Sequence, residues 1–485
     1  MQNYNLKFKK LRKRYPRFIY EGYSCKISGD NLEIFFDFKI KSNIHFQPKI
    51  VIENIDKSRI KKVGDGVLNN LIFHLGLIEM VSYWKATCSP EILIKASSLN
   101  KEQINWWKDL IIKGMGQFFY ENKIDWRNKN FIKIKTIPSK PKLLAKNAIA
   151  EIKNKDGILV PVGGGKDSVV TLELLKKAKK NIQCFSLNPT EAAQKIMKIV
   201  GCRKPIIRVR RRIDKKLLEL NRKGFLNGHT PFSAYLAFLS FLVAAVSDQK
   251  YIALSNERSS NEGNVKYLGK MINHQWSKTF EFEKKFRSYT KKYLVKNIEY
   301  FSFLRPLYEI QIAKLFSKYP KYFSAFLSCN EAYKTASGTK KPFKRWCGKC
   351  SKCLFVFAIL YPFLKEKGLL KIFRKNLFND KKLLPIMQQL IGVGSPRGFK
   401  PFECVGTKKE SIAAFYLSFL NFTKNQRLRV FCKIPFLLKY FKNKILPKYP
   451  NIKKESKIIM NVWNNQHNLP KNFKKILQKE TSKED

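Results

Sequence analysis

A run of short apolar segments alternating with amphipathic ones, over residues 157–255, most constrains the fold of this chain. Segments such as GILVPV, IQCFSL, PIIRVR and YIALS have the length of buried strands, whereas DSVVTLELLKKAKK and TEAAQKIMKIVG have the periodicity of helices. Strands that alternate with helices pair in parallel through right-handed crossovers. The pattern predicts an α/β fold with a doubly wound parallel sheet, whose ligands bind beyond the carboxyl ends of the strands.

Length and composition predict further parts on both sides of this region. The chain has 485 residues, of which 44% are hydrophobic, so it is long and apolar enough for a large core. Strand-like runs such as NLEIFFDFKI and a helix-like run, GDGVLNNLIFHLGLIEMVSYW, come first, and LFVFAILYPFL and SIAAFYLSFLNF predict late helices. We expect an α+β domain at 1–150, the α/β domain with a cysteine-rich metal knuckle at 151–360, a helical region at 361–440 and a basic tail at 441–485, poorly ordered at its very end.

The formal net charge of +60 raises the question of a nucleic-acid partner. Lysine is scattered along nearly the whole chain instead of forming one patch, so we interpret the charge as a compositional bias and do not expect nucleic acid as the partner. The denser runs, KFKKLRKRYPR and the tail from about Lys433, could contact an anionic membrane surface, although a solvated surface explains them equally.

The sequence predicts a cytoplasmic protein. The chain opens without the charged and apolar regions of a signal peptide, and the apolar stretch Phe232–Val246 is shorter than a membrane span. Thr230 and Pro231 precede this stretch and favour a buried helix there. The ten cysteines of a cytoplasmic chain predict thiols or metal ligands and not disulfides.

A glycine-rich turn follows the first strand of the α/β region. The chain reads Gly163, Gly164, Gly165, Lys166, Asp167 and Ser168 before a predicted helix. Glycines let the backbone approach an anion, helix N-terminal amides face it, and a serine adds a hydroxyl. The spacing is neither that of a Walker loop nor that of GxGxxG. GGGKDS resembles the SGGxDS motif of the PP-loop ATP pyrophosphatases, with Gly163 in place of the usual serine.

This resemblance implies ATP binding at residues 163–168. PP-loop enzymes cleave ATP between the α and β phosphates and usually adenylate an oxygen of their substrate. Because Gly163 removes one hydroxyl from the motif, the backbone amides and Ser168 have to hold the phosphates here.

Four cysteines have the spacing of a metal site. Cys347, Cys350 and Cys353 follow one another at two-residue intervals, and Cys329 lies upstream in FLSCNEAY. Four soft ligands suit either tetrahedral Zn²⁺ or an iron–sulfur cluster, and a closed four-thiolate site is structural. Some PP-loop enzymes contain a similar C…CGxCxxC zinc site, a likeness that favours zinc. Cys404 is an alternative fourth ligand, and we interpret the remaining cysteines as small core residues.

Three polar segments contain more ionisable groups than a fold requires: LNGHTPFSA, SNERSSNEGN directly after YIALS, and NHQWSKTFEFE. Two of the five histidines, His229 and His274, lie in these segments and are candidates for acid–base chemistry, although a lone histidine is more often structural. The carboxylates that could hold Mg²⁺ or act as bases are Glu257, Glu262 and Glu283. The cations that could bind phosphate or carboxylate are Arg258, Lys278 and Arg305.

Taken in order, the segments of this chain resemble those of the MurL family of UDP-N-acetylmuramoyl-L-alanyl-L-glutamate epimerases. The matching segments, within residues 157–410, are PVGGGKDS, NGHTPFSA, SNERSSNEGN, NHQWSKTFEFE, FSFLRPLYEIQIA, FLSCN, WCGKCSKCLFVF and KPFECVGT. The N-terminal part resembles the family more weakly.

The resemblance implies an isomerase of peptidoglycan precursor synthesis that acts after the ligase that adds L-glutamate. Such an enzyme uses ATP and Mg²⁺ to invert the terminal L-glutamate of the UDP-muramoyl dipeptide, and it releases AMP and diphosphate. The implied catalytic residues are His229 and His274, with Lys278 as a reserve base, and the implied structural zinc ligands are Cys329, Cys347, Cys350 and Cys353. The implied ATP-binding residues are the glycine turn at 163–168 with Asn256, Glu257, Arg258 and Glu262.

Two rival functions remain open at this point. A PP-loop enzyme that thiolates or otherwise modifies tRNA would also have high positive charge and a CxxCxxC motif. A catalytically idle nucleotide-binding module would release no diphosphate with any substrate. The oligomeric state does not follow from the sequence.

Overall fold

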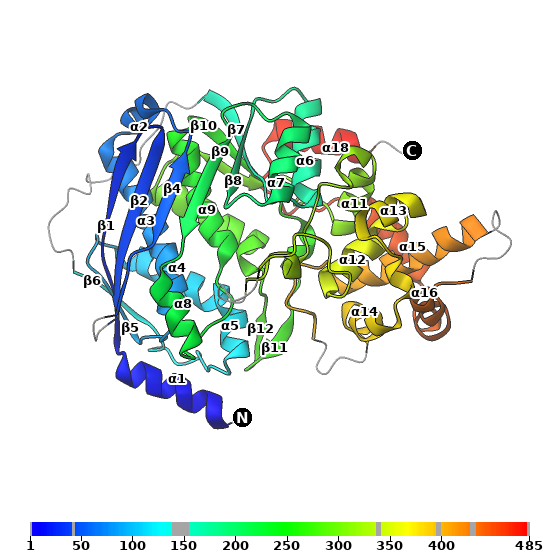
Figure 1. Cartoon of the computed structure of the whole chain (residues 1–485), viewed down its shortest axis with the longest axis horizontal. Coiled ribbons are helices and arrows are strands. Elements are labelled where there is room, and N and C mark those ends of the chain that lie inside the picture. The colour runs from blue at the N-terminus through cyan, green and yellow to red at the C-terminus, as the bar shows by residue number, and fades with distance from the viewer. Residues whose placement is uncertain are drawn as a thin grey trace.

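A single large sheet organises the chain (Figure 1). The computed structural model describes residues 2–40, 44–137, 155–335, 341–393, 399–426 and 433–482. Within them the sheet has eleven strands. Their order across the sheet is β13 (Glu299–Ser302), β10 (Gln249–Leu254), β7 (Lys155–Pro161), β8 (Ile182–Leu187), β9 (Ile207–Arg212), β4 (Lys49–Glu53), β2 (Asn31–Ile40), β1 (Arg17–Ser28), β5 (Glu91–Ile94) and β6 (Lys133–Thr136), with β3 (Ile44–Phe46) paired to β2.

The part of the sheet from β13 to β9 is parallel throughout. The helices that connect β7, β8, β9 and β10 are α6 (Lys166–Lys177), α7 (Glu191–Val200), α8 (Lys215–Arg222) and α9 (Phe232–Val246). The predicted alternation of strands and helices is therefore confirmed, and α9 has the predicted bounds.

The sheet extends beyond its parallel part into the N-terminal region. β9 pairs with β4 in antiparallel register, and β2 pairs antiparallel with β4 on one side and with β1 on the other. β5 and β6 continue in parallel from β1. The prediction of a parallel sheet thus holds only from β13 to β9, because the N-terminal strands continue the same sheet beyond β9 in antiparallel register. The predicted domain boundary at residue 150 lies outside the described residues.

Helices cover both faces of the parallel part of the sheet, and alternate side chains of β7, β8, β10 and β13 enter different cores. On β7, Leu159 packs into a core with α3 (Asp65–Trp84) and α9, whereas Ile158 and Val160 pack with α6 and α11 (Glu309–Ser317). The other helices of the first 300 residues are α1 (Gln2–Arg14), α2 (Lys57–Val63), α4 (Lys101–Gly114), α5 (Gly116–Glu121) and α10 (Phe280–Tyr293), with a small hairpin of β11 (Val265–Tyr267) and β12 (Lys270–Ile272).

The C-terminal third is helical, as predicted. Its helices are α12 (Ser351–Leu360), α13 (Glu366–Phe373), α14 (Leu384–Ile391), α15 (Lys408–Gln426), α16 (Phe436–Tyr440), α17 (Ile452–Asn461) and α18 (Lys471–Thr481). Of these, α12 to α16 gather at one end of the molecule, whereas α18 lies beside α6 (Figure 1). The basic tail is folded through Ser482, and residues 483–485, where we expected poor order, lie outside the described residues. Among the described helices, none combines the length and apolarity needed to cross a bilayer.

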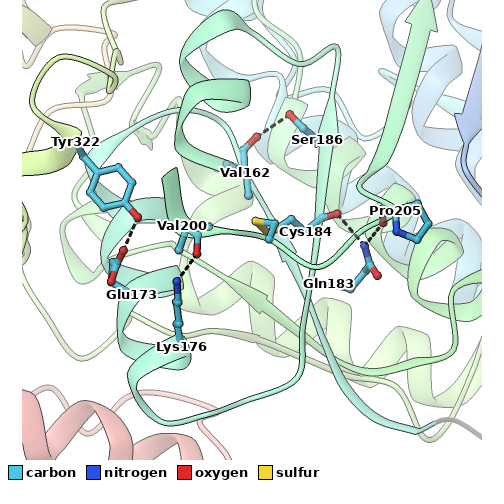
Figure 2. The surroundings of a disulfide bond; sticks show 10 residues. Val162, Glu173, Lys176, Gln183, Cys184, Ser186, Val200, Pro205 and Tyr322 are labelled. Atoms are coloured by element: carbon cyan, nitrogen blue, oxygen red, sulfur yellow. Dashed lines mark hydrogen bonds between the residues drawn. A yellow bond between two sulfur atoms is a disulfide. The ribbon is translucent and has the colours of Figure 1, made fainter. Parts of the chain in front are cut away.

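The prediction that the cysteines form no disulfide is wrong. Cys184 on β8 and Cys202, which follows α7, form a disulfide (Figure 2). The prediction rested on the expected cellular compartment. No local pattern in the sequence indicates that the turn after α7 brings Cys202 next to Cys184 on β8. Cys88, by contrast, is a free and fully buried core residue, as predicted. The same prediction is wrong for Cys25, which is free and exposed on β1, and Cys432 lies outside the described residues.

Candidate active site

The glycine turn lies at the carboxyl end of β7 and leads directly into α6, as predicted. Gly164 has a φ of 93°, and a Cβ there would lie 2.9 Å from the backbone nitrogen of Ala193. A Cβ on Gly163, in contrast, would meet no heavy atom within 4 Å. The Ser168 hydroxyl donates to the carbonyl oxygen of Gly165 at 2.9 Å, so it lies against the turn. The backbone fits an anion site at the N-terminus of α6.

Three carboxylates converge beside this turn, two of them buried and one partly buried. Asp167 opens α6, Glu257 follows β10, and Glu309 opens α11; one oxygen of each lies within 4.8 Å of the others. The parallel strands bring these residues together because their carboxyl ends meet at one edge of the sheet. Carboxylate oxygens are the ligands that Mg²⁺ prefers, so this donor set fits the ion.

Lysines neutralise part of this negative charge. The ammonium group of Lys166, which is 2% exposed, forms ion pairs with Asp167 and Glu309. Lys352 Nζ lies 3.6 Å from Glu309 Oε1. Burial opposes ionisation of Glu309, but Lys166 and Lys352 outweigh it and lower the pKa of Glu309 to about 2. Burial and the Glu309 carboxylate raise the pKa of Glu257 to about 7.

The two candidate histidines also come together. His229 lies just before α9 and His274 just after β12, and their ring centroids are 6.0 Å apart. Burial is the main cause that lowers the pKa of each ring to about 3, so both are neutral near pH 7. Lys278 lies partly buried close by. Desolvation alone would lower its pKa, but Cys404 and Glu257 raise it above the usual value. Lys278 is therefore a stable cation.

Lys352 joins the two groups of residues. Its ammonium lies against Glu309, as above, and also donates to the backbone carbonyl of Cys404. The Cys404 thiol in turn contacts Lys278. The carboxylate cluster and the histidine pair are thus neighbouring parts of one site.

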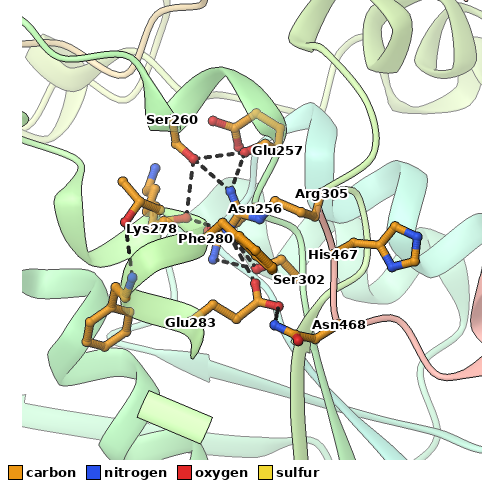
Figure 3. Close-up of polar contacts among 12 residues, drawn as sticks. Asn256, Glu257, Ser260, Lys278, Phe280, Glu283, Ser302, Arg305, His467 and Asn468 are labelled. Atoms are coloured by element: carbon orange, nitrogen blue, oxygen red, sulfur yellow. Dashed lines mark hydrogen bonds and ion pairs between the residues drawn. The ribbon is translucent and has the colours of Figure 1, made fainter. Parts of the chain in front are cut away.

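Several predicted residues instead belong to the scaffold (Figure 3). Arg305 is fully buried, donates to the backbone oxygens of Glu257 and Lys278, and pairs with Glu283 at 3.3 Å. Glu283 also accepts from Asn468 Nδ2 at 2.8 Å. The predictions that Arg305 binds a ligand phosphate and that Glu283 holds Mg²⁺ are therefore wrong, because these groups neutralise each other inside the protein.

The remaining predicted ATP contacts lie at the rim of the carboxylate cluster. Asn256 Nδ2 donates to Ser302 Oγ at 3.2 Å, as Figure 3 shows. The Arg258 guanidinium stacks over the ring of Tyr308 at 4.5 Å. Glu262 lies 3.3 Å from Lys400 Nζ and is not part of the three-carboxylate cluster.

The four predicted metal ligands form one cluster. The thiols of Cys329, Cys347, Cys350 and Cys353 lie within 4.8 Å of one another and could hold one zinc ion. Cys404 is not among them; its sulfur lies 3.4 Å from Lys278 Nζ, so the alternative fourth ligand is excluded.

Sequence reasoning missed Glu309, Lys352 and Asn264. Glu309 stands in the segment FSFLRPLYEIQIA, but only its position shortly after β13 could have marked it as a residue of the sheet edge. Lys352 lies between Cys350 and Cys353 in the sequence, where nothing distinguishes it from a surface lysine. Asn264 Oδ1 accepts from His274 Nδ1 at 3.0 Å, a contact without any local signal.

Comparison with known proteins identifies the family. The MurL N-terminal domain matches residues 9–303 and the MurL C-terminal domain matches residues 325–430. Three proteins named UDP-N-acetyl-alpha-D-muramoyl-L-alanyl-L-glutamate epimerase match this chain. The one from Xanthomonas oryzae pv. oryzae is 33% identical over 70% of this chain and 72% of that protein. The one from Salinispora tropica is 33% identical over 72% of this chain and 73% of that protein. A third, from a Micromonospora species, is 34% identical over 72% of this chain and 75% of that protein. No solved structure matches. The chain belongs to the MurL family.

Proposed function

We propose that this chain is an epimerase that inverts the terminal L-glutamate of UDP-N-acetylmuramoyl-L-alanyl-L-glutamate in the synthesis of peptidoglycan precursors. The observation that carries this proposal is the match to three epimerases over at least 70% of the chain, together with both MurL domains. The residues matched by the two domains include the glycine turn, the histidine pair, Asp167 and Glu257, whereas Glu309 lies between the two matched segments.

The reaction uses ATP as a substrate, in the manner of PP-loop enzymes. Residues 163–168 hold the phosphates, and Asn256, Glu257, Arg258 and Glu262 lie around the nucleotide. The substrate α-carboxylate attacks the α-phosphate and displaces diphosphate, which leaves AMP joined to the carboxylate. The open space around Gly163 and the N-terminus of α6 support this assignment.

Adenylation explains why an epimerase consumes ATP. A free carboxylate opposes a second negative charge on the neighbouring α-carbon. The mixed anhydride with AMP has a carbonyl that delocalises the carbanion as an enolate, so the α-proton becomes removable. Reprotonation from the opposite face and hydrolysis of the anhydride complete the inversion and release AMP.

Asp167, Glu257 and Glu309 are the residues that would hold Mg²⁺. The ion supplies positive charge that neutralises the ATP phosphates. The four-thiol cluster holds a structural zinc that fixes the start of α12, and hence Lys352, against the site.

The histidine pair lies where acid–base groups are needed. His229 and His274 are the proposed proton-transferring residues; their low pKa values rise when an anionic adenylate lies beside them. Lys278, the reserve base, is better suited as a cation that stabilises the enolate oxygen, because it stays protonated. The enzyme is cytoplasmic and acts after the ligase that adds L-glutamate.

Incubation with ATP, Mg²⁺ and the L-alanyl-L-glutamate substrate tests the proposal. We expect D-glutamate in the product by chiral chromatography and stoichiometric AMP, and neither without ATP. Retained L-glutamate with no AMP would contradict the proposal, and diphosphate release only with tRNA would favour the RNA-modifying alternative.

A further inference from the structure

Cys404 occupies a place in the site that metal binding does not explain. It lies in the loop before α15, outside the four-thiol cluster. Its sulfur is 3.4 Å from Lys278 Nζ and 4.0 Å from His274 Nε2. A thiol that faces both a cation and an imidazole has the surroundings of a reactive cysteine and not of a core cysteine.

Asn264 determines which nitrogen of His274 faces this thiol. The Asn264 amide nitrogen donates to the carbonyl oxygens of Pro401 at 2.8 Å and Lys400 at 3.4 Å. Its oxygen therefore faces His274, where it accepts from the backbone nitrogen at 2.9 Å and from Nδ1 at 3.0 Å. Because an amide oxygen only accepts, Nδ1 carries the proton of the neutral ring. Nε2 is then the unprotonated nitrogen, and it is the one nearest Cys404.

The same amide holds the thiol in place. Pro401 and Lys400 belong to the loop that contains Cys404, so Asn264 fixes the histidine and the cysteine loop together. Lys278 is partly buried and also donates to Gln275 Oε1 at 3.3 Å, which keeps its ammonium beside the sulfur. A fixed ammonium stabilises a thiolate.

The His229 ring has a nitrogen that is free to bind a ligand. Its Nε2 is buried and has no hydrogen-bond partner among the described residues, while its ring packs edge-to-face on His274. A buried polar atom without a partner is costly unless a bound group satisfies it. The free nitrogen therefore indicates that a polar substrate group binds at the histidine pair, which Cys404 contacts through His274.

We propose that Cys404 is an acid–base residue of the epimerisation, with Asn264, His274 and Lys278 positioning and ionising its thiol. The inference rests on the proposed function. The thiol is oriented by His274 Nε2 and loses its proton to water, the Lys278 ammonium stabilises the thiolate that remains, and the thiolate then removes the α-proton of the glutamyl adenylate. The C–H bond breaks, an S–H bond forms, and the electron pair moves into the adenylate carbonyl as an enolate. A proton that originates in water is added on the opposite face.

Deuterium exchange separates this role from adenylation. In D₂O with ATP, Mg²⁺ and the dipeptide substrate, wild-type protein should incorporate deuterium at the glutamyl α-carbon. Cys404→Ala and Cys404→Ser should incorporate it about 100-fold more slowly or worse, the range of a lost acid–base group, while AMP is still released. The matched control is Cys25→Ala, an exposed cysteine on β1, which should behave as wild type.

The outcomes of this experiment are distinct. Exchange near the wild-type rate in Cys404→Ala overturns the inference and leaves the proposed function standing. Loss of AMP release along with exchange also overturns it, since the residue would then serve the ATP site or the fold. A wild-type protein that releases no AMP with this substrate removes the proposed function and the inference together.

Alkylation of the wild-type protein gives a second test that needs no variant. Iodoacetamide should modify Cys404, and the dipeptide substrate together with α,β-methylene-ATP, whose α–β linkage resists cleavage, should block that modification but not modification of Cys25. Peptide mass spectrometry locates the modified cysteine. Equal modification of Cys404 with and without these ligands contradicts a place in the active site.

Discussion

At the scale of single residues, two of the three glycines in the glycine turn differ in whether the backbone and the packing require glycine. Gly164 has a left-handed backbone and packs against the start of α7, so only glycine fits without strain. Gly163 has open space around it, so its lack of a side chain is not a steric requirement. The serine that PP-loop motifs have at this point would fit here.

Substituting these two glycines should therefore give unequal results. Gly164→Ala should lose at least about 10-fold in ATP-dependent turnover and about 1–3 kcal/mol of stability, because the new Cβ meets the Ala193 backbone in a disfavoured conformation. Gly163→Ala is the matched control and should stay near wild type in AMP release and in the free energy of unfolding. Equal loss in both variants would contradict this account of the turn.

At the scale of elements, α3 is packed on all sides and carries a buried histidine. His74 is 1% exposed; its Nε2 lies 2.9 Å from the Tyr289 hydroxyl of α10, and its Nδ1 lies 2.8 Å from the carbonyl oxygen of Asn70. Trp107 of α4 donates to the same hydroxyl at 3.0 Å. Three helices thus meet at one neutral histidine.

This arrangement predicts acid sensitivity. Burial lowers the pKa of His74 from 6.5 to about 4, so between these values the unfolded chain binds a proton that the folded protein rejects. The stabilising contribution is complete above pH 6.5 and is lost as the pH falls toward 4. His74→Phe should reduce the stability lost over this window, measured by urea unfolding, by an amount on the order of 3 kcal/mol. An unchanged pH slope in the variant would contradict the prediction.

At the scale of the whole molecule, the N-terminal region and the C-terminal tail both contact the parallel part of the central sheet. Arg211 on β9 forms a two-bonded ion pair with buried Glu79 on α3, at 2.8 and 3.0 Å, across the junction between the N-terminal and parallel parts. At the other end, Phe473 of α18 packs on Tyr251 and Phe301 of the parallel strands. The basic tail therefore has a structural role as well as its charge.

Removing this aromatic contact should destabilise the whole protein. Phe473 is fully buried, so Phe473→Ala should cost about 3–5 kcal/mol of unfolding free energy, measured by denaturant titration. Lys475→Ala on the exposed face of the same helix is the control and should change stability by less than about 0.5 kcal/mol. If the two variants unfold at the same denaturant concentration, α18 does not contribute to the core.

Local features of the sequence determined much of this architecture. The alternation of β7, α6, β8, α7, β9, α9 and β10, the place of the glycine turn and the four-cysteine cluster could all be predicted. Each depends on periodicity or spacing within a few tens of residues, and such patterns set local backbone conformation and ligand geometry directly.

Only the tertiary structure decided which side chains meet. Asp167, Glu257 and Glu309 come from three separate parts of the chain, and Cys404 reaches His274 from a loop 130 residues further on. The antiparallel joint at β9, the pairing of Arg305 with Glu283 and the Cys184–Cys202 disulfide are likewise products of long-range packing. The physical reason is common to all of them: a side chain's burial and charge environment are set by neighbours that the sheet brings together from distant positions, and no local pattern records those neighbours.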